Sequence, residues 1–173
     1  MSIRSLKSKI RVVPDWPKKG ILFQDITPVL QDPKCFKELI DLMAKSVKGR
    51  KIDAVVGVDA RGFILASALA YKLNTGLVIV RKKGKLPSKT IKKNYTLEYD
   101  SNTLEMHADA ILKNQRVLIV DDLLATGGTI RATIDLVKKL KGKIVDVIFF
   151  IELKDLNGRC KLKGQKITSL IKI

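Results

Sequence analysis

A buried strand, an acidic pair and a glycine-rich turn follow one another in Val117-Leu118-Ile119-Val120-Asp121-Asp122-Leu123-Leu124-Ala125-Thr126-Gly127-Gly128-Thr129. The first four residues are apolar and mostly β-branched, which predicts a strand buried on both faces. Two carboxylates stand at the end of this strand, and a turn of small residues comes soon after them. Apolar side chains then recur at helical spacing over residues 130–140. The stretch therefore predicts a strand, a tight loop and a helix in direct succession.

Each part of this stretch suits a sugar phosphate. Backbone N–H groups of a glycine-rich turn and of a helix start can point at an anion, and Thr126 and Thr129 add hydroxyl donors. Asp121 and Asp122 would repel a phosphate, so they need sugar hydroxyls or a hydrated Mg²⁺ as their partner. The alternative is a plain strand-to-helix turn with solvated acids. A P-loop is excluded because the chain contains no GxxxxGK[ST].

The segment resembles the phosphoribosyl-diphosphate (PRPP) signature of type I phosphoribosyltransferases. Its version, Val-Asp-Asp-Leu-Leu-Ala-Thr-Gly-Gly-Thr, is similar to that of adenine phosphoribosyltransferases in particular. The resemblance implies Mg²⁺ as cofactor and four small-molecule partners, which are adenine, PRPP, AMP and diphosphate. It also implies a homodimer. By the same resemblance, residues 1–173 form one phosphoribosyltransferase domain, with an N-terminal hood over about 1–33 and a mobile loop over about 82–103.

Composition agrees with a small globular domain. A length of 173 residues suits one domain, which buries about 70% of its unfolded surface. The chain has no apolar run long enough to span a membrane, and its first residues contain no apolar signal-peptide core. Cys35 and Cys160 are expected to be free thiols of a cytoplasmic protein. The single histidine, His107, is not expected to act as a catalytic base.

A net charge of +17 raises the possibility of nucleic-acid binding. The lysines, however, are scattered over nearly every predicted loop and helix face rather than gathered in one patch. Charge alone describes solubility and steering rather than function, and a substrate with several phosphates also favours local positive charge. We therefore expect no nucleic-acid partner and no membrane partner.

The hydrophobic pattern predicts an α/β fold with a mostly parallel central sheet flanked by helices. The expected strands cover residues 54–58, 77–80, 116–120, 144–151 and 167–171, and the expected helices cover 2–11, 33–48, 62–73 and 129–140. Residues 12–33 are expected to be irregular because prolines punctuate them. Residues 82–103 are polar and basic, without a core-forming period. No internal repeat or second-domain boundary is visible.

Polar side chains gather where three of the expected strands end. Asp59 and Arg61 follow the strand 54–58, Arg81 and Lys82 follow 77–80, and Asp121 and Asp122 follow 117–120. Sites in such folds lie at the carboxyl ends of the strands. We therefore expect these three groups to converge on one crevice.

Two of these groups resemble diphosphate-binding segments of the family. Val58-Asp59-Ala60-Arg61-Gly62-Phe63 is similar to its diphosphate loop, in which the peptide bond equivalent to Asp59–Ala60 is often cis. Arg61 would bind a diphosphate oxygen pair with its planar guanidinium. Arg81-Lys82-Lys83-Gly84-Lys85 resembles the family's basic segment, so Arg81, Lys82 and Lys85 are expected on the diphosphate. The alternatives are an ordinary helix-start arginine and a solvated basic loop.

Tyr95-Thr96-Leu97-Glu98-Tyr99 resembles the mobile catalytic loop of the family. The reaction passes through an oxocarbenium-like ribose, which a closed loop protects from water. Glu98 would manage the purine proton, and Tyr99 would pack over the leaving diphosphate. The expected catalytic residues are therefore Glu98, Tyr99 and Arg61. The family usually has Gly after the Tyr, where this chain has Asp100. The alternative for residues 95–99 is an ordinary exposed hairpin strand, which their alternation also allows.

The segment Gly20–Pro28 resembles the hood that holds the adenine. Phe23 would stack on the base, and backbone groups of Leu22 and Gln24 would read its edge. Family members commonly carry Arg where this chain has Gln24. An ordinary hydrophobic segment packed on the core is the alternative.

Together these features predict an Mg²⁺-dependent transfer of phosphoribosyl from PRPP to adenine, giving AMP and diphosphate in purine salvage. The 5-phosphate is expected on residues 125–129, namely Ala125, Thr126, Gly127, Gly128 and Thr129. The ribose hydroxyls, or Mg²⁺ through water, are expected on Asp121 and Asp122, and Asp59 and Ala60 belong to the diphosphate loop. The rivals are the same fold acting on xanthine, hypoxanthine or orotate, and a PRPP-sensing regulator that binds nucleic acid. The hood argues against the first rival, and the closing loop with Glu98 argues against the second.

Overall fold

The computed structural model describes residues 3–97 and 100–173. Its contacts divide the chain into two compact units, Met1–Leu42 and Met43–Ile173, which are described separately. The first unit contains α1 (Ile3–Lys9), β1 (Arg11–Pro14), β2 (Leu22–Asp25), α2 (Thr27–Gln31) and most of α3 (Pro33–Ser46). The second contains β3 (Ala54–Val58), α4 (Arg61–Leu73), β4 (Gly76–Lys82), β5 (Thr90–Leu97), β6 (Asp100–His107), β7 (Arg116–Leu124), α5 (Gly128–Lys139), β8 (Lys143–Glu152), η1 (Lys154–Leu156), η2 (Gly158–Leu162) and β9 (Ile167–Lys172).

In the first unit, β1 and β2 form a two-stranded antiparallel sheet. Asp25 ends β2, and its Oδ1 accepts the backbone N–H of Thr27 at 2.9 Å where α2 begins. Asp32 caps α3 in the same way, since its Oδ1 accepts the N–H groups of Lys34 and Cys35. The prediction that residues 12–33 are irregular is therefore wrong. These elements are too short to show a hydrophobic period and depend on cross-strand pairing and local caps.

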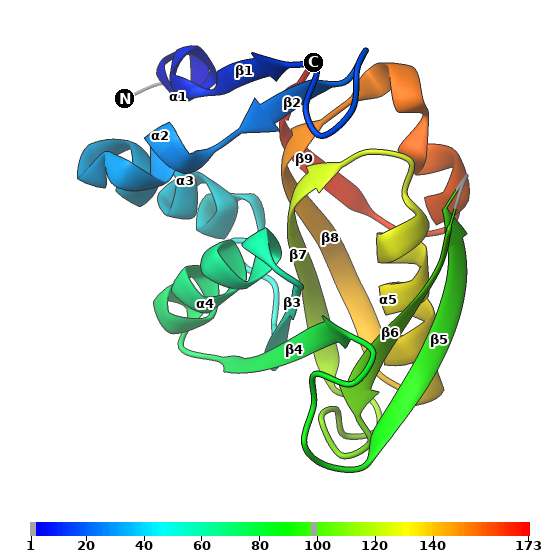
Figure 1. Ribbon diagram of the computed structural model, residues 1–173. Helices are drawn as coiled ribbons and strands as arrows, with labels where there is room; N and C mark the ends of the chain where they lie inside the picture. Colours follow the sequence, from blue (N-terminus) through cyan, green and yellow to red (C-terminus); the bar gives the residue numbers. More distant parts are fainter. Residues whose placement is uncertain (1–2, 98–99) are drawn as a thin grey trace. The chain divides into compact units, whose positions relative to one another are not determined.

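The second unit is built on a seven-stranded sheet with the order β5-β6-β4-β3-β7-β8-β9. Strands β4, β3, β7, β8 and β9 run parallel, whereas β5 and β6 are antiparallel to their neighbours. Figure 1 shows α4 and α5 on opposite faces of this sheet. The predicted α/β fold with a mostly parallel central sheet flanked by helices is confirmed.

The hairpin β5–β6 corrects the expectation for residues 82–103. The sequence there is polar because one face of the hairpin carries polar side chains such as the exposed Lys92 and Asn94. The other face packs against α5, where Ile91 and Tyr95 border the hydrophobic core. Leu104 and Met106 of β6 are buried in that core. Half-buried strands with few apolar residues give too weak an alternation to be recognised in the sequence.

Strand β7 is longer than predicted. It continues through Asp121 to Leu124 because these residues still pair with Phe149–Glu152 of β8. The two acids therefore lie within the strand rather than after it. A rigid strand, and not a loop, sets the direction of their side chains.

Cys35 is buried, Cys160 is exposed, and both are free thiols. Among residues 3–97 and 100–173, no helix has the length and apolarity needed to cross a membrane.

Asp53 ties the start of β3 to the start of β7, and it gives the fold a pH-dependent contact. Its carboxylate accepts the backbone N–H of Arg116 at 2.7 Å and both Nε–H and Nη2–H of the guanidinium. These hydrogen bonds lower the pKa of Asp53 to about 2. Unfolded Asp titrates near about 3.9, so the ionised carboxylate stabilises the fold above about pH 4. This contribution is lost as the pH falls toward the folded pKa.

We therefore expect Asp53→Asn to lower Tm at pH 7, with a difference from the wild type that shrinks as the pH falls from 4 to 2. Calorimetry across this range measures the difference. Asp109→Asn, at an exposed turn, is the matched control and should leave Tm unchanged at each pH. A Tm difference that stays constant down to pH 2 would contradict the assignment.

Candidate active site

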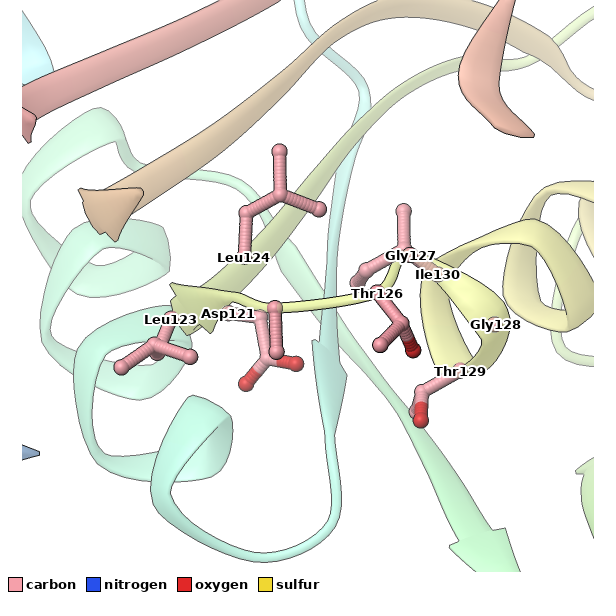
Figure 2. Close-up of a pocket in the computed structure, with 9 residues that line it drawn as sticks. Asp121, Leu123, Leu124, Thr126, Gly127, Gly128, Thr129 and Ile130 are labelled. Carbon is pink, nitrogen blue, oxygen red and sulfur yellow. The ribbon is translucent and has the colours of Figure 1, made fainter. Parts of the chain in front are cut away.

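A pocket of about 150 Å³ lies where β7 ends and α5 begins. Its lining consists of Asp121 and residues 123–130. Figure 2 shows the carboxylate of Asp121 and the hydroxyl groups of Thr126 and Thr129 on the same side of the chain, with Leu124 pointing the other way. Most of the predicted phosphate-and-ribose stretch thus lines one pocket, whereas Asp122 is not among the lining residues.

The loop of this pocket is shaped for an anion. Gly127 has φ +80°, a left-handed conformation that costs a residue with a side chain about 1–2 kcal/mol. Helix α5 starts directly after it, and its first helical hydrogen bond runs from the N–H of Arg131 to the carbonyl of Gly127. The N–H groups of the first turn lie before that bond and remain available to a ligand. The loop therefore offers backbone donors and two hydroxyls to a phosphate.

Asp121 and Asp122 face different surroundings. The Oδ1 of Asp121 accepts the backbone N–H of Asp122 at 2.9 Å, and Asp121 lines the pocket. Burial raises the pKa of Asp121 well above its ordinary value, and the charge of Asp122 raises it further. Burial also raises the pKa of Asp122, although the positive charge of Arg61 opposes this shift. The two carboxylates can therefore accept hydrogen bonds from a ligand, or bind a cation, in place of water.

Arg61 joins two of the predicted groups. Its Nε lies 2.8 Å from Oδ2 of Asp122, a residue that is only 5% exposed. Arg61 begins α4, with two residues between it and the end of β3, and β3 is the parallel neighbour of β7. The sheet order therefore brings the diphosphate loop and the acidic pair together, as the sequence predicted.

Arg81 joins the diphosphate loop to the basic segment. Its Nε lies 3.4 Å from Oδ2 of Asp59, and its Nη1 donates to the carbonyl of Lys85 at 3.1 Å. The peptide bond Asp59–Ala60 is cis, which confirms the expectation. Lys82 and Lys85 are both exposed, with their ammonium groups accessible to a ligand. The structure thus brings Asp59, Arg81 and Lys85 together.

Five further predicted residues belong to the first unit or lie outside the described residues. Leu22, Phe23 and Gln24 belong to the first unit, where Leu22 is 60% exposed and Gln24 is buried. The ring of Phe23 lies 4.3 Å from that of Trp16 in an edge-on arrangement. Glu98 and Tyr99 lie outside the described residues.

Tyr95 lies next to the pocket, although the sequence predicted no individual role for it. Its hydroxyl lies 3.5 Å from Oγ1 of Thr129, which connects the hairpin with the start of α5. Lys93, two residues earlier on β5, pairs with Asp135 of α5 at 2.9 Å. Residues 93 and 95 therefore share the strand face that meets α5. The alternation of side chains along β5 is the sequence signal that could have identified Tyr95 as a neighbour of α5.

Among the described residues, no group of three or more His, Cys, Asp or Glu side chains could by itself hold a metal ion. Mg²⁺ commonly uses one or two carboxylates and takes its remaining oxygens from water and substrate phosphates. Asp121 and Asp122 fit that pattern, because Asp121 lines the pocket and both are oxygen donors. The donor set thus suits Mg²⁺ together with a phosphorylated substrate, and not a stand-alone metal centre.

The comparisons with known proteins agree with this geometry. Residues 25–168 match the phosphoribosyl transferase domain family. The chain is 56% identical over 170 residues to the adenine phosphoribosyltransferase of Geotalea daltonii, an alignment covering 98% of this chain and 99% of the relative. The chain belongs to the adenine phosphoribosyltransferase family.

Solved structures of adenine phosphoribosyltransferases have the same fold. The enzyme from Thermoanaerobacter pseudethanolicus superposes with a TM-score of 0.98 at 52% identity, covering 99% of this chain and 100% of that one. The Saccharomyces cerevisiae enzyme, solved with an imino-altritol bisphosphate and adenine, gives a TM-score of 0.92 at 38% identity over 97% of both chains. The family likeness therefore extends over nearly the whole chain.

Proposed function

We propose that this chain transfers the 5-phosphoribosyl group from PRPP to adenine, giving AMP and diphosphate. The observation that carries the proposal is a pocket in which Asp121 lies beside the glycine-rich loop at the start of α5. Such a pocket matches a phosphorylated ribose, because the loop attracts the phosphate and a carboxylate accepts from the sugar hydroxyls. Relatives named adenine phosphoribosyltransferases at 56% identity support adenine as the acceptor base.

The lining of the pocket supports the following roles for its residues. Residues 125–129 would hold the 5-phosphate through backbone N–H groups and the hydroxyls of Thr126 and Thr129. Asp121 and Asp122 would accept from the ribose hydroxyls, or hold Mg²⁺ through water. When bound, Mg²⁺ supplies positive charge that offsets the charge of the diphosphate. Oriented binding of this kind accounts for much of the barrier reduction in a transfer between two bound substrates.

The cationic side chains would hold the diphosphate. Arg61 follows the carboxyl end of β3, the neighbour of β7, and Arg81 lies near the carboxyl end of β4, one strand further. Lys82 and Lys85 are exposed and close to Arg81 in the sequence. Asp59 and Ala60 form the turn between β3 and α4. Positive charge at these positions would stabilise the leaving diphosphate as the glycosidic bond breaks.

Three further parts of the proposal come from the family resemblance. Phe23 stacks on adenine while backbone groups of Leu22 and Gln24 read its edge. Glu98 and Tyr99, in the mobile loop of about residues 82–103, act on the purine proton and cover the diphosphate. Residues 1–173 work as one phosphoribosyltransferase domain, with the hood over about 1–33.

We also propose that the protein pairs as a homodimer and works in the cytoplasm. The exposed apolar side chains Ile64, Tyr71 and Leu77, which are 43%, 91% and 43% exposed, support a protein partner for the second unit. The two free thiols support a reducing compartment. Light scattering after gel filtration tests the dimer, and a fluorescent fusion tests the compartment.

The decisive assay supplies PRPP, Mg²⁺ and one base at a time, and follows nucleotide formation by chromatography. We expect AMP from adenine, with rates for hypoxanthine, xanthine and orotate at least about a hundred-fold lower, because buried polar groups reject a base whose edge they do not match. A reaction without PRPP is the control. No AMP from adenine, or a faster product from another base, would contradict the proposal.

A further inference from the structure

The loop of residues 125–129, called the phosphate loop from here on, is in close contact with a segment that lies further along the chain. Gly158 opens η2, and a Cβ on this residue would collide with the carbonyl oxygen of Ala125 and come within 2.9 Å of Cδ1 of Leu124. From the other side, a Cβ on Gly127 would lie 2.5 Å from the carbonyl oxygen of Gly158. The two backbones therefore touch with no space for a side chain on either glycine.

The segment that carries Gly158 is firmly held. Arg159 donates to both carboxylate oxygens of Glu152, at 2.6 Å from Nε and 2.7 Å from Nη2. The same guanidinium donates to the carbonyl of Ile167 and to Oγ of Ser169, each at 3.3 Å. Glu152 is 6% exposed, and the guanidinium lowers its pKa below the ordinary value. These hydrogen bonds from Arg159 link η2 to the last residue of β8 and to the first half of β9.

The other end of η2 is also fixed. Leu162 is fully buried in the core that contains Ile130 of α5. At the base of the loop, the N–H of Leu153 donates to the carbonyl of Leu124 at 3.0 Å. The segment therefore cannot move away from the loop without breaking buried contacts.

We infer that Gly158 is a positioning residue for the phosphate loop, an inference that rests on the proposed function. The close contact holds the carbonyl of Ala125 and the left-handed Gly127 in the arrangement that aims the loop's N–H groups at the phosphate. Gly158 itself is not among the residues that line the pocket. Its role is to leave space for the loop, and Arg159 supports that role by anchoring η2 to Glu152.

The test measures phosphate binding apart from diphosphate binding. Wild type, Gly158→Ala and Gly76→Ala are titrated calorimetrically with ribose 5-phosphate and, separately, with Mg²⁺ diphosphate. Gly76 is the matched control, because a Cβ there would have only the carbonyl oxygen of Asp53 near it, at 3.9 Å.

We expect Gly158→Ala to weaken ribose 5-phosphate binding about ten-fold, since displaced N–H groups lose charged hydrogen bonds, and to leave diphosphate binding within about two-fold. Gly76→Ala should match the wild type with both ligands. Equal binding of ribose 5-phosphate by Gly158→Ala and wild type overturns the inference, as does an equal loss of both ligands.

Two further arms separate the remaining outcomes. If Gly158→Ala does not fold, Arg159→Lys carries the test, because Lys keeps the charge but loses the paired hydrogen bonds to Glu152. We then expect about three-fold weaker ribose 5-phosphate binding with diphosphate binding unchanged, and wild-type affinity for both overturns the inference. Wild-type protein that binds ribose 5-phosphate but makes no AMP overturns the proposed function alone.

Discussion

Replacing Asp121 and Asp122 together by Asn is expected to lower kcat/KM for PRPP about a thousand-fold. A hydrogen bond to a charged group contributes about 1.5–3 kcal/mol, so the loss of two amounts to about 3–6 kcal/mol. Asn has nearly the same shape as Asp, and it still accepts the backbone hydrogen bond that Asp122 donates to residue 121. The loss should therefore come from the missing charge and not from a disturbed fold.

Steady-state kinetics with varied PRPP measure this effect, and near-ultraviolet circular dichroism checks the fold. Asp135→Asn is the matched control, because Asp135 lies on α5 but pairs with Lys93 and Arg131 rather than lining the pocket. Its kcat/KM should stay within about two-fold of the wild type, as for most surface changes. Wild-type activity in the double variant would remove the acids from the proposed mechanism.

Arg61→Ala is expected to reduce both activity and stability. The activity should fall about fifty-fold, because the guanidinium that we propose binds the diphosphate is lost. Stability should also fall, because the carboxylate of Asp122 is 5% exposed and loses the guanidinium 2.8 Å away. Breaking a buried pair costs about 3–5 kcal/mol, and the partial exposure of Arg61 reduces this to about 2 kcal/mol. The corresponding drop in Tm is about 6 °C.

A double variant separates the two effects of Arg61. Asp122→Asn removes the stranded charge, so Arg61→Ala with Asp122→Asn should recover most of the lost Tm and none of the lost activity. Arg131→Ala, an exposed arginine of α5 that pairs with Asp135, is the control and should change neither. Calorimetry and kinetics on the same preparations give both readouts. An unchanged Tm in Arg61→Ala would contradict the structural role of the pair.

Much of the second unit could be predicted from local patterns. The strand expected over 54–58 is β3, and the helix expected over 129–140 is α5, which ends one residue earlier and begins one residue earlier. Both elements bury a continuous or periodic set of apolar side chains, which is visible in any window of the sequence. The hairpin β5–β6 was not predicted over its full length, although an exposed hairpin strand was the alternative for residues 95–99, because its few apolar side chains give a weak alternation. The strands β1 and β2 are only four residues each and carry no period.

Part of the candidate site could likewise be predicted from the sequence, and part could not. The acidic pair and the loop 125–129 are adjacent in sequence, so the chemistry of that pocket wall follows from neighbouring residues alone. The contact of Arg61 with Asp122 was predictable one step further, because parallel strands align their carboxyl ends. The contact of Gly158 with the loop was not predictable. It depends on β8 and η1 returning the chain to the loop, and a glycine required for close approach has no side chain to mark it. Neighbouring residues determine the local strands, helices and loops, whereas the close backbone contact between Gly158 and the loop depends on how the sheet is assembled.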